Sequence, residues 1–336
     1  MSARRLRVAV IGVGHLGSVH ARILAGHARA ELVALVDADP ARARAQATPL
    51  RCAALGASEA LPEGLDAAIV AVPTRQHAEV AVPLLERGIA CLVEKPLAED
   101  LAAADRILAA AERGRALLAV GHVERFEPGI RRLRELGFAP RFVECHRLTP
   151  FRSRGLDVGV VHDLMIHDLD LLLHLTGAEV AQVDASGAAV VSDTLDLASA
   201  HLVFANGARA NVTASRVSLT PMRRFRVFAP QGYVCLDFAR NHGLWVGKGP
   251  GFEREREALR RLPGGEVPAD TRPLPADLLE VRELALEGLE RPLQAELDSF
   301  LACVAEHRAP EVGGRDGRAA LALAQRIDDA IRAQLW

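Results

Sequence analysis

The stretch LRVAVIGVGHLG, residues 6–17, decides the class of fold. Its first half is a short apolar run rich in β-branched residues, which is typical of a strand buried in a parallel sheet. The glycine pattern G-x-G-x-x-G follows at once, and residues 19–24 then repeat apolar side chains at helical spacing. A strand, this glycine turn and a helix form the context in which the pattern binds a dinucleotide.

Each glycine of the turn has its own physical role. Gly12 permits the tight turn, Gly14 lets the backbone approach a pyrophosphate, and Gly17 lets the helix pack closely on the strand. Free N–H groups and the positive end of the helix dipole then attract phosphate oxygens. A glycine turn without a nucleotide is the alternative. We expect the cofactor to contact Gly12, Val13, Gly14, His15, Leu16 and Gly17.

An acidic residue ends the second strand pattern. Residues 31–36 form an apolar run that ends in Asp37, twenty residues after Gly17. A carboxylate at this place accepts hydrogen bonds from the adenosine ribose hydroxyls and repels a 2′-phosphate, which favours NAD over NADP. Arg42 and Arg44 follow closely and could weaken that preference.

Strand and helix patterns go on alternating as far as residue 121. Apolar runs at residues 67–72, 90–93 and 117–120 predict further buried strands, and helix patterns open at His77 and Asp100. Regular alternation predicts a doubly wound parallel sheet. Ligands of such sheets lie beyond the carboxyl ends of the strands. That edge collects the glycine turn, Asp37, Pro73-Thr74, Glu94-Lys95-Pro96 and His122.

Lys95 is therefore a lysine on the ligand edge of the predicted sheet. Its charge could bind or polarise a substrate oxygen, or favour the loss of a hydroxyl proton. The alternative is a solvated surface lysine. The position at a strand end favours a functional role.

Residues 161–175 carry an inverted helical pattern. Asp163, His167, Asp170 and His174 are spaced four, three and four residues apart, which places them on one stripe of a mostly apolar helix. Such a stripe must face a partner, a cleft or a ligand. His167 is thus a candidate proton-transfer group, with Asp163 as its neighbour. A polar network that only holds helices together is the alternative. Metal binding by Asp163 and His167 ranks third, and no metal is expected.

After residue 122 the pattern changes to consecutive strands. Asn206-Gly207 between two of them is a hairpin signal. Residues 247–275 are rich in Pro, Gly and charge and predict a loop. The sequence predicts an α+β domain at residues 123–336, with an open, mainly antiparallel sheet, beside a nucleotide-binding domain at residues 1–122. The expected strands are 141–148, 180–188, 197–204, 208–215, 225–228 and 233–238, and the expected helices are 124–136, 292–307 and 318–335.

Three arginines are candidates for binding substrate. Arg152 and Arg154 precede the ionisable helix, and Arg216 ends a predicted strand. Guanidinium groups at these places would suit a phosphate-bearing substrate. Solvated surface charges are the alternative.

Composition excludes several classes of partner. The net charge is −2 and no run of Lys or Arg is present, so neither nucleic acid nor a membrane surface is an expected partner. The first residues lack the apolar stretch of a signal peptide. Five scattered cysteines are typical of a protein in a reducing cytoplasm.

These motifs together resemble the Gfo/Idh/MocA oxidoreductases, the relatives of glucose–fructose oxidoreductase and inositol dehydrogenase. The resemblance is carried by the glycine turn, Pro73-Thr74-x-x-His77, Glu94-Lys95-Pro96-Leu97, Asp163-x-x-x-His167 and the tail from residue 296 to 320. It implies a nicotinamide enzyme that oxidises a sugar or cyclitol hydroxyl. Its catalytic trio would be Lys95, Asp163 and His167, with His167 as proton acceptor.

The resemblance also implies further contacts. Pro73, Thr74, His77, Glu94 and Lys95 would contact the cofactor, and Lys95 and His167 the substrate. The peptide before Pro96 is cis in many relatives. The sheet of the second domain commonly makes subunit contacts, which implies a homodimer or homotetramer, and part of the tail packs on the nucleotide domain.

Within the family, residues 121–128 and 157–168 are most similar to enzymes that oxidise the 3-hydroxyl of UDP-N-acetylglucosamine on the way to lipid A precursors. One rival hypothesis is the same fold acting on a free sugar, inositol or a dihydrodiol. Another is a regulatory protein that binds NAD without turnover, although such a protein needs neither Lys95 nor His167.

Overall fold

The computed structural model describes residues 4–151, 158–260, 277–286 and 291–334. Their backbone divides into two compact units. The first holds the described parts of Met1–Glu127, Val161–Leu173 and Glu290–Leu335, and the second those of Pro128–Val160 and His174–Leu289. The first unit therefore includes most of the ionisable helix and the C-terminal helices, in addition to the expected nucleotide-binding segment, which extends to Glu127.

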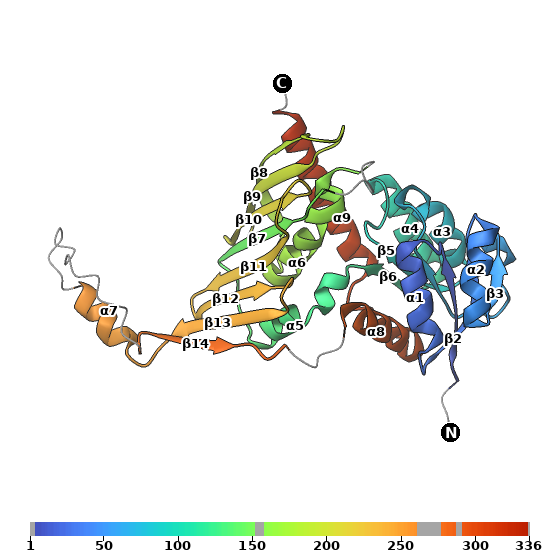
Figure 1. The fold of residues 1–336 in the computed structure, drawn as a ribbon, viewed down its shortest axis with the longest axis horizontal. Helices are drawn as coiled ribbons and strands as arrows, with labels where there is room; N and C mark the ends of the chain where they lie inside the picture. The colour runs from blue at the N-terminus through green and yellow to red at the C-terminus, as the bar shows by residue number, and fades with distance from the viewer. Residues whose placement is uncertain (1–3, 152–157, 261–276, 287–290, 335–336) are drawn as a thin grey trace. The chain divides into compact units, whose positions relative to one another are not determined.

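A six-stranded parallel sheet lies at the centre of the first unit (Figure 1). Its strands are β1 (Leu6–Ile11), β2 (Ala30–Val36), β3 (Ala53–Leu55), β4 (Ala67–Val70), β5 (Ala90–Glu94) and β6 (Leu118–Gly121). The strand order is β3-β2-β1-β4-β5-β6. Successive strands are added to one side of β1 as far as β3 and to its other side from β4 onward, so the topological switch point of this doubly wound sheet lies between β1 and β4. The expected parallel sheet is confirmed, and β3 is a short edge strand that the apolar pattern does not reveal.

Helices cover both faces of this sheet because its strands are apolar on both sides. They are α1 (His15–Ala25), α3 (His77–Glu86), α4 (Leu101–Gly114) and α8 (Pro292–Glu306). Val10 belongs to a buried cluster with residues of α1 and α8. Its neighbour Ile11 points to the other face and belongs to a cluster with residues of α3 and α4. Helix α8, from the last fifth of the chain, thus completes the core of the nucleotide-binding fold.

Acidic side chains define where several helices of the first unit begin. The Asp39 carboxylate accepts hydrogen bonds from two backbone N–H groups of α2 (Pro40–Leu50), and Asp100 accepts one in α4. In α9 (Gly314–Arg332), the Asp316 carboxylate accepts a 2.8 Å hydrogen bond from the N–H of Gly313. This cap starts α9 four residues before the expected position 318.

The second unit is built on an eight-stranded sheet in the order β14-β13-β12-β11-β7-β10-β9-β8 (Figure 1). Its strands are β7 (Phe142–Leu148), β8 (Val180–Ala188), β9 (Leu197–Phe204), β10 (Arg209–Ser215), β11 (Met222–Ala229), β12 (Gly232–Asp237), β13 (His242–Lys248) and β14 (Leu279–Glu283). Among the strands of this sheet that the structure describes, only β7 and β10 pair in parallel. The expected open, mainly antiparallel sheet is confirmed. Asn206-Gly207 makes the expected turn, with Gly207 at φ +83°.

The helix expected at residues 124–136 is wrong as a single element. The chain forms a 3₁₀ turn, η3 (Val123–Phe126), and then α5 (Pro128–Glu135). Glu127 lies between them at φ −59°, ψ 132°. The residue before a proline is disfavoured in the helical region, and proline is favoured at the first helical position. Pro128 therefore ends one element and begins the next.

The loop expected at residues 247–275 is wrong in its first part. Residues 252–260 form α7 (Phe252–Arg260), and Arg256 pairs with Glu253 one turn away at 3.0 Å. Such pairs stabilise a helix made mostly of charged residues. The α7 segment adjoins β14, since the Arg254 guanidinium is 2.9 Å from the Asp277 carboxylate. The rest of the expected loop, from residue 261, lies outside the described residues.

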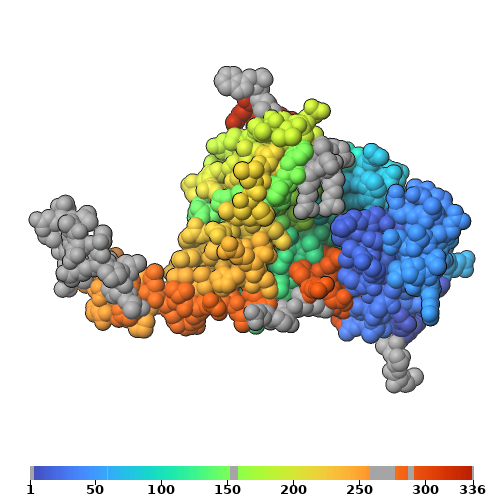
Figure 2. Space-filling model, viewed as in Figure 1, coloured from blue at the N-terminus to red at the C-terminus, as the bar shows by residue number. Residues whose placement is uncertain are grey.

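The outer surface of the first unit is partly visible in Figure 2, where blue segments that include α1 and α2 are exposed. Leu16, in the first turn of α1, is 38% exposed. Among the helices that the structure describes, none has the length and apolar character needed to cross a membrane.

Candidate active site

The glycine turn after β1 is required by the packing of the protein itself. Gly12 has φ +86°, and a Cβ there would lie 2.5 Å from the carbonyl oxygen of Ala71. A Cβ on Gly17 would lie 1.8 Å from the carbonyl oxygen of Gly12. A Cβ on Gly14, in contrast, would meet no described atom within 4 Å. Gly12 and Gly17 therefore shape the turn, whereas the surface at Gly14 is open to a ligand.

The N-terminus of α1 presents backbone donors at this turn. Gly14 is the N-cap residue, and among the described residues no side chain caps the helix. His15 and Leu16, the first residues of the helix, are exposed. Uncapped N–H groups and the positive end of the helix dipole together make a site for an anion. The turn thus has the chemistry that a pyrophosphate needs.

Asp37 follows the carboxyl end of β2 and joins the glycine turn. Its Oδ2 accepts a 3.0 Å hydrogen bond from the backbone N–H of Val13, and its Oδ1 accepts one of 2.9 Å from the N–H of Asp39. Arg42 reaches within 3.3 Å of the same carboxylate, which is 7% exposed. The carboxylate is held in place on the ligand edge, with one cation beside it.

Pro73, Thr74 and His77 follow β4 at the same edge. Thr74 begins the 3₁₀ turn η2 (Thr74–Gln76), which leads into α3. His77 is only 1% exposed, and its ring lies 2.9 Å from the carbonyl oxygen of Val72 and 3.0 Å from that of Pro96. These contacts tie the loop after β4 to the loop after β5. A part for His77 in cofactor binding is therefore indirect.

Glu94 and Lys95 stand at the end of β5, and their side chains differ in surroundings. The Glu94 carboxylate is buried, with Oε1 2.6 Å from Nε2 of His20 in α1. The Lys95 side chain is 17% exposed. The peptide between Lys95 and Pro96 is cis, as the resemblance implies.

The structure brings Lys95 and Asp163 together, although 68 positions separate them in the sequence. Nζ of Lys95 donates a 2.7 Å hydrogen bond to the backbone carbonyl oxygen of Asp163 and lies 3.4 Å from its Oδ1. The Asp163 side chain is 43% exposed. Two members of the expected trio are thus in direct contact, and the pair remains accessible.

The helix that carries Asp163 and His167 departs from the expected geometry. It begins with a π-helical turn, η4 (Val161–Met165), before α6 (Ile166–Thr176) continues. A π-turn holds more residues than an α-turn, so the stripe drawn at 100° per residue is wrong at its start. Short π-segments occur often at functional sites. His167 lies half-buried in the first turn of α6, within the unit that holds Lys95.

Asp170 of the stripe has a structural role. Its carboxylate accepts hydrogen bonds from Nε and Nη2 of Arg125 at 2.7 and 2.6 Å, and both side chains are almost fully buried. For this residue the alternative reading of the stripe, a buried polar network, is correct. The pair fixes α6 to η3 and thereby sets the position of His167.

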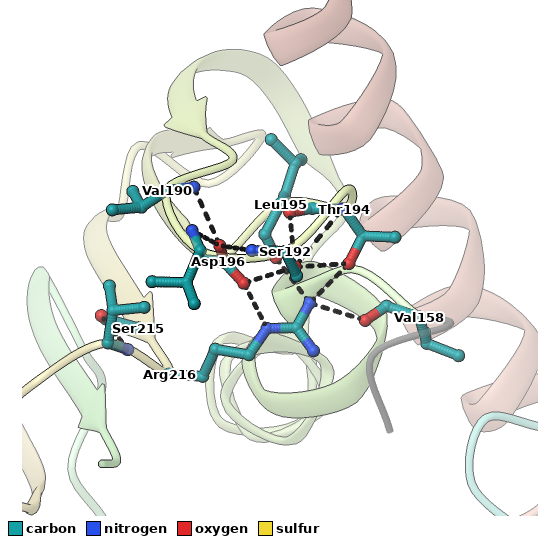
Figure 3. Close-up of polar contacts among 10 residues, drawn as sticks. Val158, Val190, Ser192, Thr194, Leu195, Asp196, Ser215 and Arg216 are labelled. Carbon is teal, nitrogen blue, oxygen red and sulfur yellow. Dashed lines mark hydrogen bonds and ion pairs between the residues drawn. The ribbon is translucent and has the colours of Figure 1, made fainter. Parts of the chain in front are cut away.

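The three candidate substrate arginines are placed differently. Arg152 and Arg154 lie outside the described residues. Arg216 is 5% exposed, and its Nε is 3.0 Å from Oδ1 of Asp196 (Figure 3). Its Nη2 donates to the carbonyl oxygens of Val158 and Leu195, each at 2.8 Å. The guanidinium thus contacts other residues of the second unit, and these contacts favour a structural role over the expected contact with substrate.

Sequence reasoning did not single out three buried polar residues of the first unit, which are His20, Arg125 and Glu296. His122, which it placed on the ligand edge, is fully buried. Burial lowers the pKa of His122, and neither of its ring nitrogens has a hydrogen-bond partner among the described residues. A signal existed for Glu296, because Phe300 and Cys303 follow it at helical spacing on the buried face of α8.

Two family models match this chain. The model of an oxidoreductase family with an NAD-binding Rossmann fold, GFO_IDH_MocA, matches residues 6–122. The model of the GFO/IDH/MocA C-terminal domain matches residues 103–235.

Individual relatives match over nearly the full length. UDP-N-acetylglucosamine 3-dehydrogenase of Acidithiobacillus ferrooxidans is 40% identical over 332 residues, which are 98% of each chain. Its solved structure has a TM-score of 0.86 at 37% identity and covers 98% of this chain and 99% of that one. Inositol 2-dehydrogenase of Rhizobium meliloti is 28% identical over 345 residues, covering 97% of this chain and 96% of that one.

Proposed function

The chain belongs to the Gfo/Idh/MocA family of oxidoreductases, and on that premise we propose that it oxidises the 3-hydroxyl of UDP-N-acetylglucosamine to a ketone with NAD as the oxidant. The substrate is that of a relative similar over 98% of both chains. The observation that carries the proposal is the contact of Lys95 with Asp163, which sets a partly exposed cation at the carboxyl end of β5.

The residues at the glycine turn fit a nicotinamide dinucleotide. Gly14 leaves its surroundings open, and the uncapped start of α1 supplies donors for a pyrophosphate. Asp37 supplies acceptors for the adenosine ribose hydroxyls. Its charge disfavours a 2′-phosphate, so we propose NAD as the cofactor. The adjacent Arg42 is already paired with Asp37, which limits its use as a phosphate ligand.

In the proposed reaction the protein removes a proton and orients the reacting hydroxyl. His167 accepts the hydroxyl proton, because an imidazole exchanges protons near neutral pH. The Lys95 ammonium donates a hydrogen bond to the same oxygen and stabilises the negative charge that develops on it. Asp163 holds Lys95 in position through its backbone carbonyl oxygen. When bound, NAD supplies the acceptor for the hydride that leaves the substrate carbon.

Replacing the two proposed catalytic side chains tests the mechanism. NADH formation is measured with UDP-N-acetylglucosamine, an aminotransferase and glutamate, so that the ketone is removed as it forms. Lys95→Ala and His167→Ala should each lower kcat by about 10²-fold or more. Lys248→Ala replaces the only other lysine in the sequence, and His242→Ala an exposed histidine of β13; both should keep the activity. Near-normal turnover in both catalytic variants would refute the assignment.

The alternative substrate class is a free sugar or a cyclitol. The similarity to an inositol dehydrogenase over 97% of the chain favours it. Activity that needs the UDP group supports the nucleotide sugar, whereas activity on inositol that is indifferent to UDP supports the rival. NAD binding without turnover on either class would leave the regulatory hypothesis standing.

Two expectations about the protein in the cell stay predictions. The first is a homodimer or homotetramer formed through the sheet of the second unit, which size-exclusion chromatography with light scattering would test. The second is a cytoplasmic location, which is expected from the scattered cysteines.

A further inference from the structure

Three titratable side chains meet inside the first unit, away from the Lys95–Asp163 contact. His20 comes from α1, Glu94 from the end of β5 and Glu296 from α8. Their possible ligand atoms all lie within 4.8 Å of one another, and all three residues are buried. Within this cluster, as the structure describes it, the hydrogen bond joins His20 and Glu94 and is 2.6 Å long.

Glu296 is unusual among these three. It is 2% exposed, and neither of its carboxylate oxygens has a hydrogen-bond partner among the described residues. An ionised carboxylate in such a place is costly, because it has lost its hydration and gained no donor. Burial, together with the negative charge of Glu94, raises the pKa of Glu296 well above its ordinary value.

Within this cluster, Glu94 is the residue that adjoins the proposed site, because it is the last residue of β5 and precedes Lys95. A Cβ on Gly121, in the neighbouring strand, would lie 2.8 Å from its Oε2, so the side chain occupies space that only glycine leaves free. His20 and Gly121 thus restrict the Glu94 side chain from two different elements, and Glu296 lies beside it, within 4.8 Å.

We propose that Glu296 is a positioning residue of the cofactor site, held as a neutral carboxylic acid beside Glu94. The two carboxyl groups then carry a single negative charge, which His20 contacts, and no repulsion drives Glu94 away. The end of β5, and with it Lys95, keeps its place. This inference rests on the proposed function, because it takes the end of β5 to be part of an NAD site.

Other charged groups near Glu296 do not supply an alternative. From η3, which packs against α8, come Glu124 and Arg125, and from the turn after α1 comes His27, which pairs with Asp298 of α8. Glu311 lines the same small cavity as Glu296. The negative charge of Glu94 raises the pKa of Glu296 in addition to burial.

The first test detects protonation of Glu296 through the pH dependence of the melting temperature of the cofactor-free chain. Between the pKa of an unfolded glutamate, about 4.3, and the raised pKa of Glu296, the folded state binds one proton more than the unfolded state. Stability contributed by this group is therefore lost as pH rises through that window. Glu296→Gln removes the ionisable group, so its melting temperature should fall less with pH from 5 to 9 than that of the wild type.

A matched control is available on the same helix. Glu306→Gln makes the same change at a side chain that is 55% exposed, and should keep the pH slope of the wild type. An equal slope in Glu296→Gln and the wild type would overturn the proposal. So would a rise in wild-type melting temperature with added ZnCl₂ or MnCl₂ that Glu296→Gln abolishes, because the cluster would then be a cation site.

The second test asks whether protonation of Glu296 affects the affinity for NADH. NADH binding, followed by fluorescence, should weaken roughly tenfold per pH unit above the pKa of Glu296 in the wild type, and should not depend on pH in this range in Glu296→Gln. The same pH dependence in both proteins would overturn the positioning role. If NADH does not bind at all, the proposed function fails, while the melting experiment still reports on the proton.

Discussion

Removing the Arg125 guanidinium should destabilise the protein by about 3–5 kcal/mol, the usual effect of breaking a buried ion pair. Arg125 and Asp170 are joined by two hydrogen bonds of 2.7 and 2.6 Å, and their side chains are 3% and 1% exposed. Arg125→Met would leave the Asp170 carboxylate buried without its cation. The loss should exceed that of an exposed pair severalfold, because water cannot compensate for the missing partner.

The geometry predicts an asymmetry between the two partners. Nη2 of Arg125 also lies 3.2 Å from Oδ1 of Asp316. Asp170→Asn therefore leaves Arg125 with a second carboxylate and should cost less than Arg125→Met. The double variant Arg125→Met, Asp170→Leu should recover much of the loss, because apolar side chains of similar volume replace a buried pair at little cost.

Urea unfolding followed by far-ultraviolet circular dichroism measures these differences. Arg106→Met is the control, since Arg106 pairs with Glu79 at 2.9 Å with both side chains mostly exposed. This control should change the free energy of unfolding by less than about 1 kcal/mol. The reasoning is refuted if Arg125→Met stays within that same range, because the buried pair would then contribute no more than a surface one.

Three further variants test other features of the molecule. Asp37→Ser should lower the ratio of NAD to NADP activity by about tenfold or more, because it removes the acceptor for the ribose hydroxyls and the repulsion of a 2′-phosphate; an unchanged ratio would exclude Asp37 as the determinant. Burial lowers the pKa of His122. Below a pH of about 6.5 the unfolded chain therefore takes up a proton that the folded chain does not, and the stability of the folded state falls as the pH falls. His122→Phe should reduce this loss of stability in melting curves from pH 7 to 5. Asp196→Asn should cost about 3 kcal/mol or more in thermal unfolding, because the carboxylate accepts three backbone N–H bonds and faces Arg216, while NADH binding stays intact.

The parts of the fold that were predictable depend on local patterns. Residues 6–17 already contain a strand, a turn and the start of a helix, and the structure has all three there. Pro128 has a local effect too, but proline permits both the start and the end of a helix. The α7 segment consists mostly of charged residues, so it offers few apolar side chains from which a helix could be predicted.

The candidate site was predictable only as far as topology determines it. Parallel strands bring Asp37, Glu94 and Lys95 to one edge of the sheet whatever the side chains do. Which residue of the ionisable stripe has which partner depends on contacts distant in sequence. Lys95 contacts Asp163, and Arg125 pairs with Asp170. The buried contacts of Arg216 were not predictable, because a strand-end arginine has the same local pattern whether it faces a ligand or a buried aspartate.

The way the chain returns to the first unit has a consequence for its synthesis. Leu297, Phe300 and Leu301 of α8 are buried against the same face of the sheet as Val8 and Val10. When only the first half of the chain has been synthesised, part of this apolar face of the sheet is therefore not yet covered by α8. That surface stays exposed until about the last forty residues emerge, a period in which growing chains aggregate or engage chaperones. Premature termination near residue 290 should thus yield an insoluble product even though every strand of the first sheet is present.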